Sequence, residues 1–181
     1  MTSLLVLQPP AATVAVDEVK AFLRIEHRAE DALIAGFIRS AEAMCEAFTG
    51  LALVERAVAE IVPAARGWQR LGATPVRAIT GVAALAIDGV ETALAPEAYA
   101  VDVDAAGDGW VRVLDAGPAR LVRVSFSAGM AADWNGVPEP LRQGMVRLAA
   151  HLYSARGAAE GAPPPAMVAA LWRPWRRLRA S

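Results

Sequence analysis

The sequence of 181 residues contains one cysteine, two histidines and one lysine. The single cysteine, Cys45, excludes an intrachain disulfide and a metal site built from several cysteines. No apolar run approaches the roughly 20 residues that a membrane-spanning helix needs, and the first residues lack the basic start and cleavage site of a signal peptide. We therefore expect a globular protein that is neither exported nor inserted in a membrane.

Charge is distributed unevenly along the sequence. Residues 1–139 carry 18 acidic and 11 basic side chains, whereas residues 140–181 carry seven arginines and one acid, Glu160. The overall net charge of −1 therefore hides a C-terminal segment of net charge +6. This polarity predicts that the C-terminal segment meets an acidic partner, whereas the rest of the chain repels polyanions.

Apolar residues at helical spacing predict three helices, over residues 16–24, 30–48 and about 137–156. Thr49-Gly50 ends the second helix, and a further amphipathic segment covers residues 166–179 after a linker rich in Gly, Ala and Pro. The residues expected in the core are Leu33, Phe37, Met44, Phe48, Leu141, Met145 and Leu148.

Between the helices, alternating apolar residues predict a small, largely antiparallel sheet with one buried face. Its expected strands are residues 54–62, 76–87, 99–103, 110–113 and 122–126. Asp88-Gly89 predicts a tight hairpin in which both central residues have positive φ. The predicted class is thus α+β: a helical bundle of two N-terminal helices and a later helix, with an inserted antiparallel sheet and a C-terminal helical or extended arm.

The predicted organisation has five parts. They are an N-terminal arm (1–13), the first core helices (14–53), a β-rich insert (54–136), a third core helix (137–157), and a linker with a basic C-terminal anchor (158–181).

The sequence shows no motif for catalysis or metal binding. His27 and His151 have no nucleophile or carboxylate at a recognisable spacing, and Cys45 falls in an apolar helix stripe, which favours an inert core thiol. The segment from residue 102 to 109 starts like a calcium-binding loop, but Ala106 replaces the third ligand and Val113 replaces the final glutamate, so a β-turn is favoured. We predict no catalytic residue, no metal site and no cofactor.

The C-terminal segment combines tryptophan and arginine, which suits an anchor because Trp buries a large area and Arg makes forked contacts with carboxylates or phosphates. The predicted anchor residues are Trp172, Arg173, Trp175, Arg176, Arg177 and Arg179. One alternative is an amphipathic helix packed on its own domain with a solvated arginine face. A second is a nucleic-acid-binding module in which these residues contact phosphates and bases, and a third is a small enzyme that uses Asp102, Asp104 or His151.

The order of these parts resembles the head-tail connector (adaptor) family of tailed bacteriophages, prophages and phage-derived gene transfer agents. The resemblance covers about residues 14–156 and is carried by "AEAMCEAFTGLAL" (41–53) and "SAGMAADWNGVPEPLRQGMVRLAAHLY" (127–153). It implies a structural, non-enzymatic subunit that forms a ring, typically twelvefold, beneath the portal of a capsid.

The resemblance also implies the partners and the location. The partners would be further copies of the chain, the portal protein gripped by the C-terminal anchor, and a stopper or tail-terminator protein. Double-stranded DNA would pass through the channel without specific binding, and no membrane would be contacted. The protein would assemble in the bacterial cytoplasm and lie at the neck between head and tail of a virion or virus-like particle.

Overall fold

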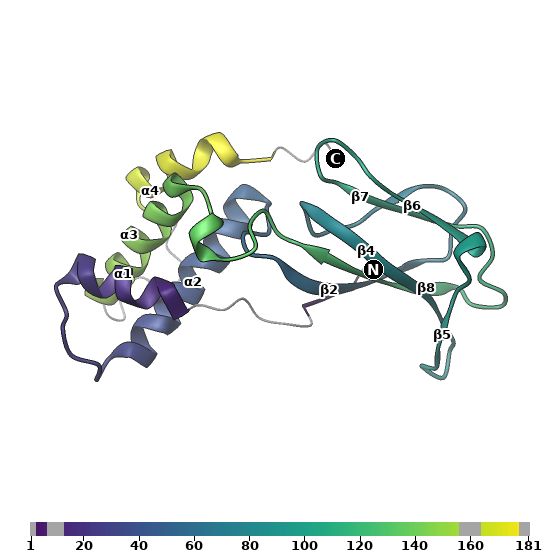
Figure 1. Ribbon diagram of the computed structural model, residues 1–181, viewed down its shortest axis with the longest axis horizontal. Helices are drawn as coiled ribbons and strands as arrows, with labels where there is room; N and C mark the ends of the chain where they lie inside the picture. Colours follow the sequence, from purple (N-terminus) through teal and green to yellow (C-terminus); the bar gives the residue numbers. More distant parts are fainter. Residues whose placement is uncertain (1–2, 7–12, 156–163, 178–181) are drawn as a thin grey trace. The chain divides into compact units, whose positions relative to one another are not determined.

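The computed structural model describes residues 3–6, 13–155 and 164–177, and the chain divides into two compact units. The β-rich unit comprises residues 1–10 and 54–130, and the helical unit comprises residues 11–53 and 131–181 (Figure 1). The β-rich unit thus ends at Met130, whereas the predicted insert extended to residue 136. Helices and antiparallel sheets are both present, which confirms the predicted α+β class.

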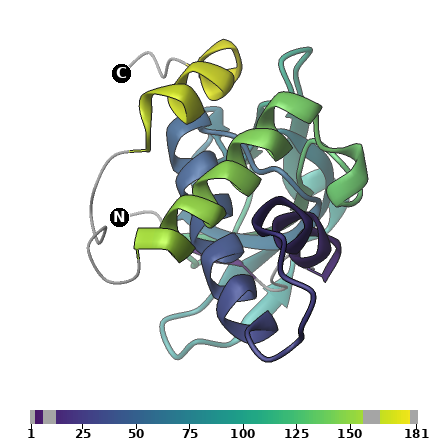
Figure 2. The ribbon, with the colours of Figure 1, turned by 90° about the vertical axis from the view of Figure 1, so that its left-hand side faces the viewer.

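Four α-helices lie among the described residues of the helical unit. They are α1 (Thr13–Leu23), α2 (Asp31–Thr49), α3 (Glu139–Ala155) and α4 (Ala166–Trp172). The 3-10 turn η3 (Arg173–Trp175) follows α4 directly. Gly50 ends α2 because its φ of 74° allows the left-handed cap, and its N–H donates to the carbonyl of Glu46. In Figure 2, α3 crosses α2 and has α1 and α4 on its two sides.

The buried face of α2 differs from the predicted one. Its fully buried apolar residues are Ile34, Ile38, Ala41 and Cys45, whereas Leu33 is 44% exposed, so the prediction of Leu33 in the core is wrong. Two apolar stripes lie side by side on α2. The stripe of Ile34, Ile38, Ala41 and Cys45 faces the core of the helical unit, because its smaller residues let the neighbouring helices approach more closely than the stripe with Phe37 and Phe48 would.

The larger aromatic residues of α2 lie at the margins of this interface. Phe37 and Phe48, like Met44, are half-buried. The Phe37 ring meets Tyr153 of α3 edge-on at a centroid distance of 6.4 Å, and the Phe48 ring faces Trp172 of α4. On α3, the predicted core residues Leu141, Met145 and Leu148 are buried.

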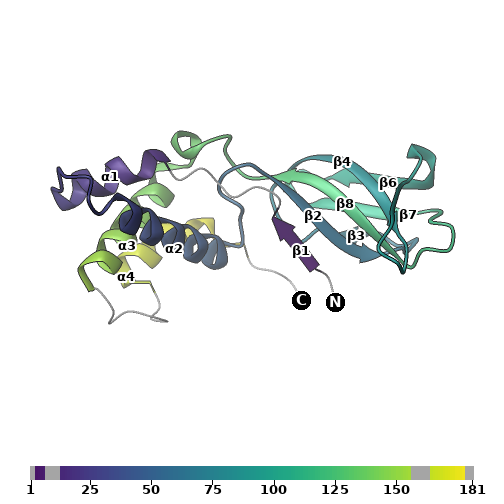
Figure 3. The ribbon, with the colours of Figure 1, turned by 90° about the horizontal axis from the view of Figure 1, so that it is seen from below.

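The β-rich unit contains two antiparallel sheets, which corrects the prediction of one. The five-stranded sheet has the order β1 (Ser3–Val6), β2 (Arg56–Pro63), β8 (Leu121–Ala128), β4 (Val76–Leu85) and β5 (Glu91–Ala93). The three-stranded sheet has the order β3 (Gln69–Arg70), β7 (Gly109–Val113) and β6 (Tyr99–Val103). Figure 3 shows β1, within the predicted N-terminal arm, beside β2, with which it pairs in antiparallel register.

Alternation places one face of β7 and of β8 in the core of this unit. On β8, Val122, Val124 and Phe126 are buried while the residues between them are partly exposed. On β7, Val111 and Val113 are buried in the same way. The alternating pattern that predicted these strands therefore also marks their inward faces.

The hairpin between β4 and β5 has a three-residue loop rather than the expected two-residue turn. The N–H of Ala86 donates to the carbonyl of Val90 at 3.0 Å, which closes the loop. Gly89 has a φ of 84°, but Asp88 does not have positive φ. Asp88 instead accepts a hydrogen bond from the N–H of Val90 through its side chain at 3.1 Å, so only the glycine needs the left-handed conformation.

Candidate functional site

The structure places Trp172 in the core of the helical unit. Its side chain is 0% exposed, its ring lies 5.9 Å from the Phe48 ring, and its Nε1 donates to the carbonyl of Leu141 at 3.3 Å. A buried indole with its N–H satisfied is a packing residue. The prediction that Trp172 itself grips a partner therefore does not hold for this conformation, and the alternative of a segment packed on its own unit applies at this position.

Gly144 of α3 makes the space that Trp172 fills. A Cβ built on Gly144 would lie 2.1 Å from Nε1 of Trp172 and less than 3 Å from two further ring atoms. Only the lack of a side chain at position 144 leaves room for the indole against α3. Trp172 and Gly144 together dock the C-terminal segment.

The residues after Trp172 present positive charge at the surface. Arg173 and Arg176 are exposed and Trp175 is half-buried. The Arg176 guanidinium lies 5.7 Å from the centroid of the Phe48 ring, and the backbone N–H of Arg177 donates to the carbonyl of Thr49 at 2.8 Å. Arg179 lies outside the described residues.

The charge asymmetry of the sequence is much smaller in the fold. The helical unit combines ten acidic with eleven basic residues, and the β-rich unit combines nine acidic with seven basic residues. Their net charges are therefore +1 and −2, because the helical unit combines the acidic segment 11–53 with the basic segment 131–181. Arg142 of α3, for example, lies 3.7 Å from Glu18 of α1 and also pairs with Glu139.

The residues considered for chemistry are not brought together. His27 and His151 are exposed on different elements. Cys45 is buried, and burial above all, with the nearby Glu46 and Glu42 carboxylates, raises the pKa of its thiol far above its usual range. Such a thiol is unreactive. Among residues 3–6, 13–155 and 164–177, no three metal-ligating side chains cluster.

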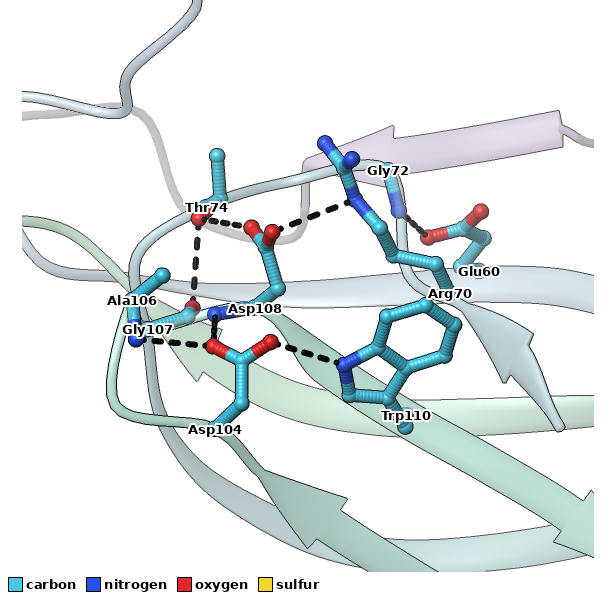
Figure 4. A network of polar contacts seen from close by, with 9 residues as sticks. All are labelled: Glu60, Arg70, Gly72, Thr74, Asp104, Ala106, Gly107, Asp108 and Trp110. Atoms are coloured by element: carbon cyan, nitrogen blue, oxygen red, sulfur yellow. Dashed lines mark hydrogen bonds and ion pairs between the residues drawn. The ribbon is translucent and has the colours of Figure 1, made fainter. Parts of the chain in front are cut away.

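The loop after β6 is a structural turn rather than a cation site (Figure 4). The Asp104 carboxylate accepts hydrogen bonds from the backbone N–H groups of Ala106 and Asp108, each at 2.9 Å, and from Nε1 of Trp110 at 3.1 Å. The Thr74 hydroxyl contacts Asp108 Oδ1 at 2.9 Å, which joins this loop to the β3–β4 connection. Asp104 and Asp108 therefore hold the end of the three-stranded sheet in place.

Two exposed features of the β-rich unit were not predicted. Ile87, in the β4–β5 loop, is fully exposed with a relative accessibility of 108%. Trp68 is 46% exposed, and the guanidinium of Arg112 lies 4.8 Å from its ring centroid. Sequence reasoning could have noted the local "RGWQR" for the second feature, but the stacking partner comes from a distant strand.

The described part of the chain has no helix that is long and apolar enough to span a bilayer. A search of the curated proteins gave no significant match.

The comparisons with families and solved structures agree. The model of the phage gp6-like head-tail connector protein family matches residues 13–86. A chain in the "neck of empty GTA particle computed with C6 symmetry" is 29% identical, with a TM-score of 0.80 over 99% of this chain and 97% of that one. A chain in the "neck of native GTA particle computed with C12 symmetry" is 27% identical, with a TM-score of 0.77 over 99% and 97%.

A third structure is the most similar of these in sequence. A chain in the "virion of native gene transfer agent (GTA) particle" is 30% identical, with a TM-score of 0.78 over 98% of this chain and 97% of that one. Identity at this level over nearly the whole of both chains exceeds what a shared fold alone requires. Together with the family match, it shows that the chain belongs to the family of phage gp6-like head-tail connector proteins.

Proposed function

We propose that the protein is a subunit of a closed ring in the neck of a phage or gene-transfer-agent particle, where it joins the DNA-filled capsid to the tail. The observation that carries this proposal is the similarity over 97–99% of both chains to neck components solved with C6 and C12 symmetry. Copies related by such rotations need interfaces that are heterologous and that close. The role is structural rather than catalytic.

The ring surrounds a channel through which double-stranded DNA passes without specific binding. A subunit of net charge −1 suits this role, because strong binding to duplex DNA needs many phosphate contacts from clustered Lys and Arg. The near-neutral charges of the two units, −2 and +1, support a channel on which DNA can slide.

The portal protein is contacted through the segment after Trp172. Arg173 and Arg176 are exposed there and Trp175 is half-buried, so these three side chains form the anchor, while the buried Trp172 fixes their position. The opposite partner is a stopper or tail-terminator protein.

The experiment that tests the ring is native mass spectrometry with negative-stain imaging of the purified full chain, alone and with portal-bearing capsids. We expect closed rings, formed freely or on the capsids. A chain that stays monomeric in both conditions would refute the proposal. For the anchor, Arg173→Glu with Arg176→Glu should abolish recruitment to capsids and leave the far-UV circular dichroism spectrum unchanged, because both side chains are exposed.

The rival function, a nucleic-acid-binding module at the C-terminus, is less favoured by the burial of Trp172, which cannot stack on bases. It is tested by salt dependence. Phosphate contacts would make binding to duplex DNA fall steeply as ionic strength rises, whereas a protein anchor would respond less.

A further inference from the structure

The tip of the β4–β5 hairpin is apolar and acidic. We define the hairpin tip as Ile87, Asp88, Val90 and Glu91. Ile87 and Val90 are 108% and 57% exposed, respectively, and residues 86–91 contain two acids and no base. Glu91 pairs with Arg123 at 2.7 Å. Ile87 and Val90 together form an exposed apolar pair at one loop tip, which a second molecule can cover.

A second surface of the same unit is aromatic and basic. We define the basic face as Trp68, Arg70 and Arg112, which share it with one exposed acid, Asp102, opposite Trp110 in the β6–β7 register. Arg70 lies opposite Trp110 in the β3–β7 register, and cross-strand partners share a face. Residues 110 and 112 alternate with the buried Val111 and Val113, so this is the outer face of the three-stranded sheet. Figure 4 shows Arg70 beside the Trp110 ring.

The charges of the basic face are only partly compensated. Arg70 lies 3.6 Å from Asp108. Within the described residues, no acidic side chain forms an ion pair with Arg112. Arg112 instead stacks on the half-exposed Trp68 ring. This surface combines the two residue types, Trp and Arg, that contribute most often to protein interfaces.

We propose that the hairpin tip of one copy docks on the basic face of the next copy around the ring. This inference rests on the ring proposed above and names one of its contacts. Asp88 of the tip and Arg112 of the basic face have opposite charge, and neither forms an ion pair with a described residue of its own subunit. Each surface also offers an exposed apolar side chain, yet the two do not meet within a subunit, since Ile87 is fully exposed. A contact between two different surfaces of identical chains is heterologous, as a ring requires.

The chemistry of the contact follows from these residues. Ile87 packs on the Trp68 ring, and the Asp88 carboxylate approaches the Arg112 guanidinium. The apolar pair adds to the affinity, whereas the charges orient the approach and disfavour the contact of two identical tips.

A cross-linking experiment tests the contact directly. The full chain is prepared with Ile87→Cys, with Trp68→Cys and with both substitutions, and is exposed to oxidised glutathione, which is reduced as each disulfide forms. The native Cys45 is buried and does not interfere. The double variant should give a series of covalent multimers beyond the dimer on a non-reducing gel, whereas each single variant should stop at the dimer because it supplies one thiol per chain.

Charge exchange provides a second measurement that needs no cysteine. Asp88→Lys and Arg112→Glu should each weaken ring association at least about fivefold, corresponding to about 1 kcal/mol per contact, and the combined variant should recover most of the loss. Asp88→Asn keeps the side-chain acceptor of the turn and separates loss of charge from loss of the loop. Arg120→Glu, an exposed arginine outside both surfaces, is the matched control and should have no effect.

The outcomes separate this inference from the ring itself. If the double cysteine variant forms rings by native mass spectrometry but no covalent multimer beyond the dimer, the proposed contact is wrong and the ring stands. A closed covalent dimer would also show that the proposed contact is wrong. A contact worth about −4 kcal/mol is half occupied at about 1 mM. A chain that is monomeric in solution up to this concentration, and that also forms no ring on capsids, would overturn the ring and the contact together. Binding of duplex DNA that Arg112→Glu abolishes while rings persist would assign the basic face to nucleic acid instead.

Discussion

Replacing Gly144 with alanine should destabilise the helical unit although alanine is the better helix former. The added Cβ would lie 2.1 Å from Trp172 Nε1, far inside an ordinary contact, and the indole has no room to move because it is fully buried against Phe48 and the Leu141 carbonyl. Overpacking of this kind costs about 1–3 kcal/mol. The higher helix propensity of alanine offsets about 1 kcal/mol of this cost.

Expulsion of the indole sets an upper limit to this cost. A tryptophan buries roughly 150–250 Å², so its exposure at about 25 cal/mol per Å² would cost about 4–6 kcal/mol. Because the clash is severe, we expect a cost at the upper end of the overpacking range, about 3 kcal/mol. The gain in helix propensity of about 1 kcal/mol leaves a net loss of about 2 kcal/mol in the free energy of unfolding. The loss should appear in urea denaturation followed by circular dichroism.

Gly36 of α2 offers a matched control. A Cβ there meets only Arg39 Nη2 at 3.8 Å, so Gly36→Ala should stabilise the protein by about 0.5–1 kcal/mol. In a Trp172→Ala background the clash disappears, and Gly144→Ala should then be neutral or stabilising, which gives a coupling energy of about 2 kcal/mol or more. Equal effects of the Gly144 and Gly36 substitutions, or additivity with Trp172→Ala, would refute the proposed packing.

Three further changes test the β-rich unit, each by urea denaturation. Burial raises the pKa of the Glu60 carboxyl above its usual 4.5, so ionisation of this group destabilises the fold increasingly as pH rises from 4.5 through the raised pKa. The free energy of unfolding of Glu60→Gln relative to wild type should therefore increase over that pH window, and a difference that stays constant with pH would contradict this. Gly129→Ala should cost more than about 2 kcal/mol, because its φ is 155° and a Cβ would lie 2.3 Å from a backbone nitrogen, whereas Gly81→Ala, with nothing within 4 Å, should be tolerated. Asp104→Ala should cost about 1–3 kcal/mol and change the fluorescence of Trp110, whose indole N–H loses its acceptor; an unchanged spectrum would count against this network.

The elements that sequence reasoning predicted well are those with local causes. The second helix was predicted to within one residue at each end, because apolar spacing and Gly50 determine it locally. Alternation likewise identified β8. The division of the strands between two sheets depends on pairing between distant segments, and β3 has only two residues, so neither left a local pattern.

The candidate site was harder to predict than the fold, for a physical reason. Trp172 and the arginines after it form one compositional cluster, yet Trp172 is buried and Arg173 is exposed. The difference arises from Gly144 on another helix, which makes room for the indole. Composition predicts that the Trp and Arg side chains of a segment make contacts, but it does not predict whether those contacts are with another protein or within the same subunit.

Burial of Trp172 changes the energetics expected for an anchor. An anchor that orders only on binding loses conformational entropy at that moment, which lowers its affinity. Here the docked indole, the Arg177 N–H bond to Thr49 and the 3-10 turn at 173–175 already fix the segment before any partner arrives. The exposed Arg173 and Arg176 are therefore presented in one arrangement. If the portal is the partner, as proposed above, the affinity for it should fall in proportion to the fraction of molecules in which the segment is undocked. Gly144, which contacts no partner in this scheme, thus becomes a determinant of recruitment as well as of stability.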